Sequence, residues 1–276
     1  MRFRTRRRHL LFYNDGSVPL LQAITFDLGG TLLEYENVPW EDLEATGWRS
    51  VHAQVVDGGR FAPLASGLAN GTADDFAATM MAVSTRFWRR AEETYQSAAL
   101  HHIFAEGLAH LGLTPVDPSD FVALAEHFHA ATVDLVSVYD DSLATLAELK
   151  RRGVKLALIS NTLWPGELHT RDLRRFGLHE FFDILTYSSE MTHTKPHRSI
   201  FLETLRQLGD VPPEAAAHVG DRIVDDVQGA QGAGMRGILK AHPRRVPVEG
   251  IEPDARITCL AELPAALDRL FDGQSP

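Results

Sequence analysis

The sequence has a single cysteine and lacks any long apolar run. With Cys259 as the only thiol, the chain cannot form an internal disulfide, which predicts a reducing cytoplasm as its compartment. No stretch approaches the roughly 18 apolar residues that a membrane-spanning helix needs, so we expect no membrane segment. At 276 residues, 44% of them hydrophobic, the chain can fill one large domain or two modest ones.

Positive charge is also scarce outside the N-terminal arm. The net charge is −10, and subtracting the five arginines of residues 1–8 leaves about −15 for the rest of the chain. Such an acidic body argues against nucleic acid as a partner, because phosphate backbones need a cationic surface. We expect residues 1–21 to form a basic, disordered extension.

The spacing of apolar residues changes along the rest of the chain. Residues 23–26 are an apolar run that predicts a buried strand, bounded by Gly29 and Gly30. Between residues 37 and 138 the spacing is helical, and we expect no strand. The predicted helices of this stretch are 41–56, 74–95, 98–111 and 119–133, with a break around 62–71.

After residue 139 strands and helices alternate. The predicted strands are 154–159, 183–187, 216–219, 237–240 and 256–260. The predicted helices are 142–152, 167–176, 198–208, 225–231 and 261–271. Alternation of this kind builds a parallel sheet covered by helices on both faces. We therefore predict an α/β protein whose parallel sheet is interrupted near its start by an all-helical insert.

Polar residues follow the predicted strands in a fixed order. Asp27, Ser160, Asn161 and Asp221 come after strands, and Lys195 lies in a loop before a helix. Because ligands of open parallel sheets bind at the carboxyl ends of the strands, we expect these side chains to share one site. Carboxylates, a hydroxyl, an amide and an ammonium are the parts of a phosphoryl-transfer site.

Each residue type suits that chemistry. Asp27 can attack phosphorus and form an aspartyl-phosphate, and Lys195 supplies a positive charge against the negative charge that develops. Gly30 lets the backbone turn and aim its N–H groups at phosphate oxygens. The side chains that can hydrogen-bond the same oxygens are Thr31, Ser160 and Asn161.

The carboxylates also predict a metal. Asp221 beside Asp27 would bring two negative charges together, and Mg²⁺ between them removes the repulsion. Asp225 or Asp226 could complete the coordination shell, directly or through water, and we expect Asp226 to be the ligand.

These residues resemble the four ordered motifs of the haloacid dehalogenase-like (HAD) hydrolase superfamily. The matching segments are residues 26–32, 159–161, 194–201, and 219–226 with 229–235. The resemblance implies a Rossmann-like core over residues 22–36 and 139–276. It also implies that residues 37–138 form a helical cap, inserted between the first and second motifs.

The same resemblance assigns roles at the site. It implies that Asp27 is the nucleophile and that Mg²⁺ is held by Asp27, Asp221 and the backbone carbonyl of Gly29. Phosphatases of this family usually carry a second aspartate at the position of Gly29, which protonates the leaving oxygen and then activates water. General acid–base help is worth roughly 10²–10⁴-fold in rate, so its absence is a large departure.

Three functions fit a site with this departure. We favour a Mg²⁺-dependent hydrolase of small phosphorylated metabolites, with Glu34, Glu36 or His193 as candidate replacements for the missing acid. A metal-independent 2-haloacid dehalogenase also fits, because halide leaves without a proton. The third is a non-catalytic module that binds phosphate without turnover.

The insert holds no motif that specifies a substrate. Its aromatic residues, Trp40, Trp48, Phe87 and Trp88, are more typical of a helical core than of ligand contacts. One or two of them remain candidates to cover the site, because the insert must exclude water from it. Trp164 differs, because it follows Asn161 closely at the expected rim of the site. We expect a small-molecule phosphorylated substrate, no nucleic acid or membrane partner, and either a monomer or a homodimer.

Overall fold

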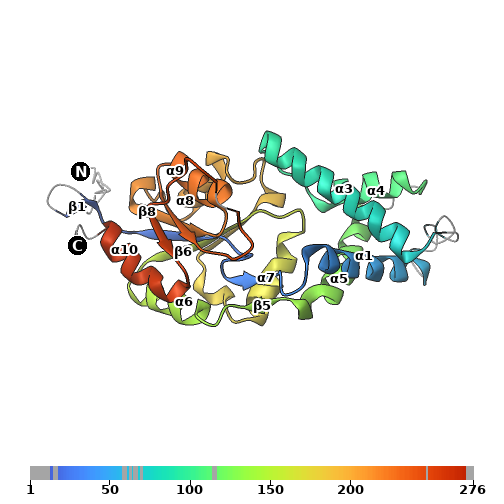
Figure 1. The fold of residues 1–276 in the computed structure, drawn as a ribbon, viewed down its shortest axis with the longest axis horizontal. Helices are drawn as coiled ribbons and strands as arrows, with labels where there is room; N and C mark the ends of the chain where they lie inside the picture. The colour runs from blue at the N-terminus through green and yellow to red at the C-terminus, as the bar shows by residue number, and fades with distance from the viewer. Residues whose placement is uncertain are drawn as a thin grey trace, which may run out of the picture.

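The computed structural model describes residues 13–14, 18–57, 61, 64, 68, 71–113, 117–246 and 248–271. Most of the predicted extension over residues 1–21 lies outside the described residues. Within it, β1 (Tyr13–Asn14) pairs antiparallel with β2 (Val18–Pro19). Figure 1 shows a sheet-containing core and a helical cap side by side along the long axis.

The core is a parallel sheet of six strands, which confirms the predicted fold class. The strands run in the order β10-β9-β8-β3-β6-β7. They are β3 (Ala23–Phe26), β6 (Lys155–Ser160), β7 (Ile184–Tyr187), β8 (Ala216–Gly220), β9 (Arg236–Lys240) and β10 (Ala255–Ile257). Because β3 lies between β6 and β8, the residue that follows it enters the middle of the sheet's carboxyl edge.

Helices cover both faces of the sheet because its strands are apolar on both sides. In β3, Ile24 and Phe26 pack with α6, α7 and α10, whereas Ala23 packs with α8 and α9. These helices are α6 (Ser142–Arg151), α7 (Gly166–Arg175), α8 (Arg198–Gln207), α9 (Gly229–Gly232) and α10 (Leu263–Phe271). Short turns of 3₁₀-helix also occur, at η2 (Val133–Leu135), η3 (His179–Phe181), η4 (Ser188–Glu190), η5 (Pro213–Ala215) and η7 (Leu260–Glu262).

The helix predicted over residues 225–231 differs from the prediction. A π-helix, η6 (Ile223–Gln228), begins two residues earlier, and only α9 after it is α-helical. The Asp226 carboxylate accepts a hydrogen bond from the backbone N–H of Arg222 at 2.8 Å, which anchors the first turn. Such π-helical turns are frequent at functional sites, and sequence periodicity does not predict them.

The cap consists of α1 (Trp40–Val56), α3 (Ala73–Thr94), α4 (Leu100–His110) and α5 (Pro118–Thr132). These helices pack around the fully buried Trp48. The predicted absence of strands between residues 37 and 138 is wrong at its end. There β5 (Ser137–Val138) pairs antiparallel with β4 (Leu33–Glu34), so a short two-stranded ribbon joins the two chain segments that connect cap and core.

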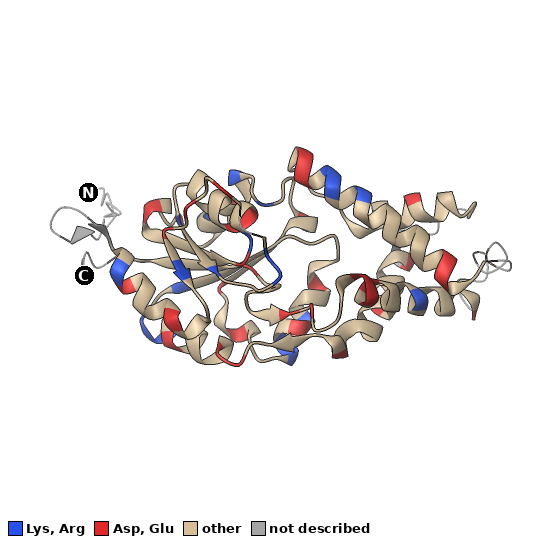
Figure 2. Ribbon diagram, viewed as in Figure 1, with Lys and Arg blue, Asp and Glu red and all other residues tan. Residues whose placement is uncertain are grey.

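The described helices and the placement of charged residues bear on membrane and nucleic-acid partners. None of the described helices combines the length and apolar character needed to cross a membrane. Figure 2 shows acidic and basic residues interspersed over the core and the cap. Nucleic-acid backbones instead need a continuous basic surface.

Candidate active site

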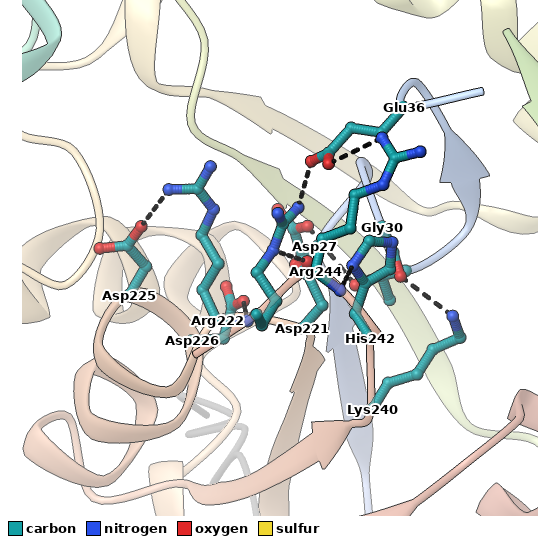
Figure 3. A network of polar contacts seen from close by, with 12 residues as sticks. Asp27, Gly30, Glu36, Asp221, Arg222, Asp225, Asp226, Lys240, His242 and Arg244 are labelled. Carbon is teal, nitrogen blue, oxygen red and sulfur yellow. Dashed lines mark hydrogen bonds and ion pairs between the residues drawn. The ribbon is translucent and has the colours of Figure 1, made fainter. Parts of the chain in front are cut away.

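The carboxyl edge of the sheet holds a buried cluster of charges. Asp27 follows β3, and its backbone N–H still donates to the carbonyl of Val219 in β8 at 2.9 Å. The ammonium of Lys195 donates to Asp27 Oδ1 at 2.7 Å and to Asp226 Oδ1 at 2.6 Å. Asp221 is the third carboxylate of the cluster, and Figure 3 shows it beside Asp27 and Asp226. The structure thus brings together the acids and the lysine that the motifs predict.

Burial and pairing set the pKa values of this cluster. Burial raises the pKa of Asp27 to about 6, although the Lys195 ammonium opposes the rise. At Lys195 burial acts to lower the pKa, but Asp226 and Asp27 outweigh it and raise the pKa above its usual range. At Asp226 burial is likewise outweighed by Lys195 and His218, which lower its pKa. Lys195 and Asp226 are therefore fixed in their charged forms.

Asp226 is held by a line of polar groups that begins inside the sheet. His218 Nε2 lies 3.1 Å from Asp226 Oδ1, and His218 Nδ1 lies 2.7 Å from the hydroxyl of Thr25. Thr25 and His218 are both fully buried. Sequence reasoning missed both residues, although a polar side chain within a short apolar strand was the available signal. Their role is to position Asp226, which in turn holds Lys195.

Two glycines let the carboxylates approach the backbone. Gly30 has a φ of +76°, and a Cβ there would lie 2.4 Å from Asp221 Oδ2. A Cβ at Gly220 would lie 2.1 Å from Asp226 Cγ. Figure 3 also shows Lys240 reaching the carbonyl of Gly30, at 3.0 Å. A side chain at either glycine would displace a carboxylate from the site.

The predicted phosphate-binding side chains have different surroundings. Ser160 and Asn161 line the cavity above Asp27, as does Gly30. Asn161 accepts from the backbone N–H of Lys195 at 2.8 Å and donates to its carbonyl at 3.0 Å, so it fixes the lysine loop. The hydroxyl of Thr31 is fully buried, 3.5 Å from Asp27 Oδ2. Thr31 therefore faces the nucleophile rather than the open cavity.

The three carboxylates suit a hard cation such as Mg²⁺. One ligand oxygen from each of Asp27, Asp221 and Asp226 lies within 4.8 Å of the others. Asp221 Oδ1 is buried and has no hydrogen-bond partner among the described residues, while Asp221 Oδ2 accepts from Arg245. A buried carboxylate oxygen without a donor is destabilising unless a cation or a water completes its shell. The donor set therefore fits Mg²⁺.

Arginines surround the cluster on its cavity side. Arg245 donates to Asp221 and to Glu36 Oε1, the latter at 2.7 Å, and Arg244 lies 3.3 Å from Glu36 Oε2. Arg222 is 3.6 Å from Asp225, a pair that Figure 3 also draws. Arg222, Asp225 and Arg245 all line the cavity. Burial, reinforced by Asp226, raises the pKa of Asp225 to about 6.

None of the three candidate replacements for the missing acid is free for that task. Burial acts to raise the pKa of Glu36, but hydrogen bonds and charge from Arg245 and Arg244 outweigh it and lower the pKa. The pKa of Glu34 is also lowered against burial, by hydrogen bonds from Tyr139 and His242. His193 lies 3.2 Å from Ser199 Oγ and stacks on His197, with ring centroids 3.8 Å apart.

The space beside Gly29 is filled by Tyr35. A Cβ at Gly29 would lie 3.3 Å from Tyr35 Cδ2, a contact that would force the ring to shift slightly. The hydroxyl of Tyr35 donates to Asp172 Oδ2 at 3.2 Å, and it lies 3.4 Å from His169 Nδ1. Asp172 Oδ1 in turn lies 2.8 Å from His129 Nε2 in the cap. This cluster joins core, cap and connecting segment next to the nucleophile.

A cavity of about 440 Å³ opens above Asp27, between core and cap. Trp164 lines it, at the rim where the sequence places it. Trp40 and Trp88 of the cap line it as well, whereas Trp48 belongs to the core of the cap. Trp48 therefore has the core position typical of such aromatics, whereas Trp40 and Trp88 are the two that cover the site. Sequence periodicity could not separate them, because each lies on a helix with other apolar residues.

Comparison with known proteins places the chain in a family. The model of the haloacid dehalogenase-like hydrolases matches residues 21–234, and the chain belongs to this family. Figure 1 shows this region spanning both the sheet and the cap. The motif resemblance seen in the sequence is thereby confirmed.

Several curated relatives are similar over part of their length. The chain is 34% identical over 146 residues to the glyceraldehyde 3-phosphate phosphatase of Methanopyrus kandleri, covering 53% of this chain and 60% of the relative. It is 36% identical over 126 residues to the phosphoserine phosphatase of Thermus thermophilus, covering 46% and 49%. The chain thus spans about half the length of the curated relatives it matches.

Solved structures share the fold. A HAD phosphatase from Thermococcus onnurineus has a TM-score of 0.60 and 24% identity, covering 90% of this chain and 98% of the other. A 2-haloacid dehalogenase from Pseudomonas syringae pv. Tomato has a TM-score of 0.59 and 24% identity, covering 91% and 99%. At this identity the likeness shows the fold, which hosts both chemistries.

Proposed function

We propose that the protein is a Mg²⁺-dependent phosphatase of small phosphorylated metabolites that acts through an aspartyl-phosphate on Asp27. The observation that carries the proposal is the charge cluster, in which Lys195 bridges Asp27 and Asp226 at the floor of a cavity of about 440 Å³. The names of the curated relatives support a phosphatase. A cytoplasmic location, and a monomeric or homodimeric state, stay predictions from the sequence.

The reaction follows from the floor residues. Asp27 Oδ1 accepts from Lys195. Among the described residues, Oδ2 has only the long contact from Thr31, so Oδ2 is the oxygen that can attack phosphorus. The new Asp27 O–P bond forms as the ester P–O bond breaks, and the alcohol leaves with a proton from water. A water molecule then attacks phosphorus, which returns the carboxylate and releases phosphate, and the proton that this water loses neutralises the hydroxide left by the first step. Lys195 stays protonated throughout and offsets negative charge on the phosphoryl group.

The metal ligands we propose are Asp27, Asp221 and the backbone carbonyl of Gly29. Asp226 would act on Mg²⁺ through water, because its oxygens already accept from Lys195, His218 and the Arg222 backbone. When bound, Mg²⁺ would offset the negative charge of the carboxylates and of the phosphate, which otherwise repel each other. Lys195 forms ion pairs with Asp27 and Asp226, and Arg245 forms one with Asp221.

The missing acid predicts a narrow range of good leaving groups. Gly29 offers no proton, and the candidate acids Glu34 and Glu36 have lowered pKa values. We therefore expect esters with acidic leaving groups to react far faster than alkyl phosphates. A Brønsted plot of log kcat/KM that is flat in leaving-group pKa would contradict this expectation.

One experiment tests the central proposal. Release of p-nitrophenol from p-nitrophenyl phosphate is measured with and without Mg²⁺, for the parent and for Asp27→Asn. This leaving group needs little protonation, so the glycine at position 29 does not hide activity. We expect Mg²⁺-dependent turnover that Asp27→Asn abolishes. Turnover that persists in Asp27→Asn would exclude Asp27 as the nucleophile.

Absence of turnover would favour the two alternatives, a metal-independent 2-haloacid dehalogenase or a non-catalytic phosphate-binding module. Gly29 is the observation that favours the dehalogenase, because halide leaves without a proton. Chloride release from 2-chloropropionate that is insensitive to a chelator would identify the dehalogenase. Binding of beryllium fluoride without release of any product would identify the binding module.

A further inference from the structure

The cavity above Asp27 has a wall of indole rings that the chemistry at its floor does not use. Trp40 at the start of α1, Trp88 in α3 and Trp164 after β6 all line it. None of these three residues is fully buried, and Trp40 is 38% exposed. Trp48 of the same cap shows the usual alternative, a ring with 0% exposure in the core. Aromatic surface left facing a cavity is surface that a ligand can cover.

One ring of the wall, that of Trp164, is held in place by its neighbours. The Trp164 ring centroid lies 4.0 Å from that of Phe128 and 5.7 Å from that of Trp48. The Trp164 backbone N–H donates to Thr162 Oγ1 at 3.0 Å, which fixes the loop. Trp88 lines the cavity from the same face of α3 as Ala91. Rings that are already ordered lose little entropy when a ligand binds.

Charge at the floor fixes the direction in which a ligand enters. Lys195, Arg222 and Arg245 line the cavity near Asp27, where the phosphate must lie for attack. The rest of the ligand then extends toward the cap and its indoles. A cavity volume of about 440 Å³ is large enough for a phosphate group and one ring of a ligand attached to it. Small-molecule sites of roughly 300–1,000 Å³ are typical.

We propose that this cavity selects phosphate monoesters whose alcohol carries a planar aromatic or heteroaromatic ring, which lies against Trp88 and Trp164. The inference rests on the proposed phosphatase function and names its substrate class. Stacking of a base on an aromatic side chain strengthens binding by roughly 5- to 150-fold. Nucleoside monophosphates and aralkyl phosphates share this chemistry.

The test compares two phosphonates that cannot be hydrolysed, 2-phenylethylphosphonate and 2-cyclohexylethylphosphonate. They share their charge, linker and number of carbons and differ in the planarity of the ring. Calorimetry in the presence of Mg²⁺ should give a Kd at least about fivefold lower for the phenyl compound. We expect Trp88→Leu to remove this preference. Phe87→Leu is the matched control and should keep it, because Phe87 stacks on His102 within the cap.

The controls separate this inference from the function on which it rests. Acetyl phosphate has no ring and needs no acid, so its hydrolysis by the parent tests phosphatase activity alone. Equal affinities for the two phosphonates, in a protein that hydrolyses acetyl phosphate, would overturn the inference and leave the function standing. A phenyl preference that survives in Trp88→Leu would also overturn the inference, provided that this variant has the same melting temperature as Phe87→Leu.

Calorimetry also shows whether the ring of the preferred ligand belongs to a nucleotide or to an aralkyl phosphate. Adenosine 5′-monophosphate and ribose 5-phosphate are compared in the Asp27→Asn variant, where turnover does not interfere. Alongside a phenyl preference, tighter binding of the nucleotide would indicate nucleotides as the source. Equal binding of these two ligands would indicate aralkyl phosphates.

Discussion

The floor of the cavity and its wall differ in how their side chains are held. At the floor, Asp27, Lys195 and Asp226 are at most 8% exposed, and hydrogen bonds of 2.6 and 2.7 Å join them. Along the wall, Trp88 and Trp164 are only partly buried, and they pack against the apolar core of the cap. Both regions belong to one cavity.

Substitutions in the floor and in the wall should therefore have different consequences. Removing one member of a buried charge group leaves an uncompensated charge, which destabilises the fold as well as the chemistry. Removing a partly exposed ring mainly removes area that a ligand would cover. The floor should therefore tolerate almost no change, whereas the wall can change the choice of substrate at small cost in stability.

The largest effect should come from Lys195→Met. The change leaves Asp27 and Asp226 buried together without their cation. We expect the free energy of unfolding to fall by about 3–5 kcal/mol and turnover to fall by about 10²–10³-fold. Urea unfolding and hydrolysis of p-nitrophenyl phosphate measure the two effects. Lys150→Met, which removes a partly exposed ion pair with Asp183, should lose less than about 1 kcal/mol. Equal losses in the two variants would refute the distinction.

A gain of function should follow from restoring the acid together with space for it. Gly29→Asp alone brings the new Cβ to 3.3 Å from the Tyr35 ring, so we expect a limited gain. Gly29→Asp with Tyr35→Leu should raise kcat for alkyl phosphates by about 10²-fold. Tyr35→Leu alone is the control and should give no gain. If the double variant is no faster than the parent, the missing acid does not limit the rate.

Asp172→Leu should test the hydrogen bonds that join the core to the cap beside the cavity. Asp172 is 2% exposed and accepts from Tyr35 in the connecting segment and His129 in the cap. Leaving both donors without an acceptor should lower the free energy of unfolding by about 1–3 kcal/mol. The midpoint of urea unfolding reports the change. Asp134→Leu removes an ion pair whose carboxylate is 85% exposed and should have almost no effect. A similar loss in both would show that Asp172 contributes no more than a surface charge.

A pH dependence of stability should also arise at His169. Burial lowers its pKa from the ordinary value of 6.5 to about 4. The unfolded chain therefore binds a proton here below pH 6.5, while the folded protein does so only near pH 4. Stability should be lost as pH falls through this window, and His169→Gln should lose less of it. Urea midpoints at about pH 7 and about pH 4.5 measure the difference. His110→Gln, at a residue with a 55% exposed side chain, should follow the parent curve.

The elements that the sequence predicts well are those with a strong local pattern. The helices of the cap and the strands of the sheet lie within one or two residues of the predicted bounds at most ends, for example α1 (Trp40–Val56) and β7 (Ile184–Tyr187). Among the exceptions are the paired strands β4 and β5, which depend on each other, and η6, which depends on the anchored carboxylate of Asp226. Neither of these contacts leaves a local pattern to detect. The strand predicted over 256–260 also ends early, at Ile257.

The sequence by itself determined the order of the polar residues along the chain and the parallel sheet that gathers them. Asp27 and Lys195 meet for this reason, because carboxyl ends of parallel strands share one edge. Only the tertiary structure decided which groups support and surround them. Thr25 and His218 are 193 positions apart, and the Tyr35 ring occupies the space beside Gly29. Such contacts depend on distance in space, whereas periodicity records only the face of an element that is buried.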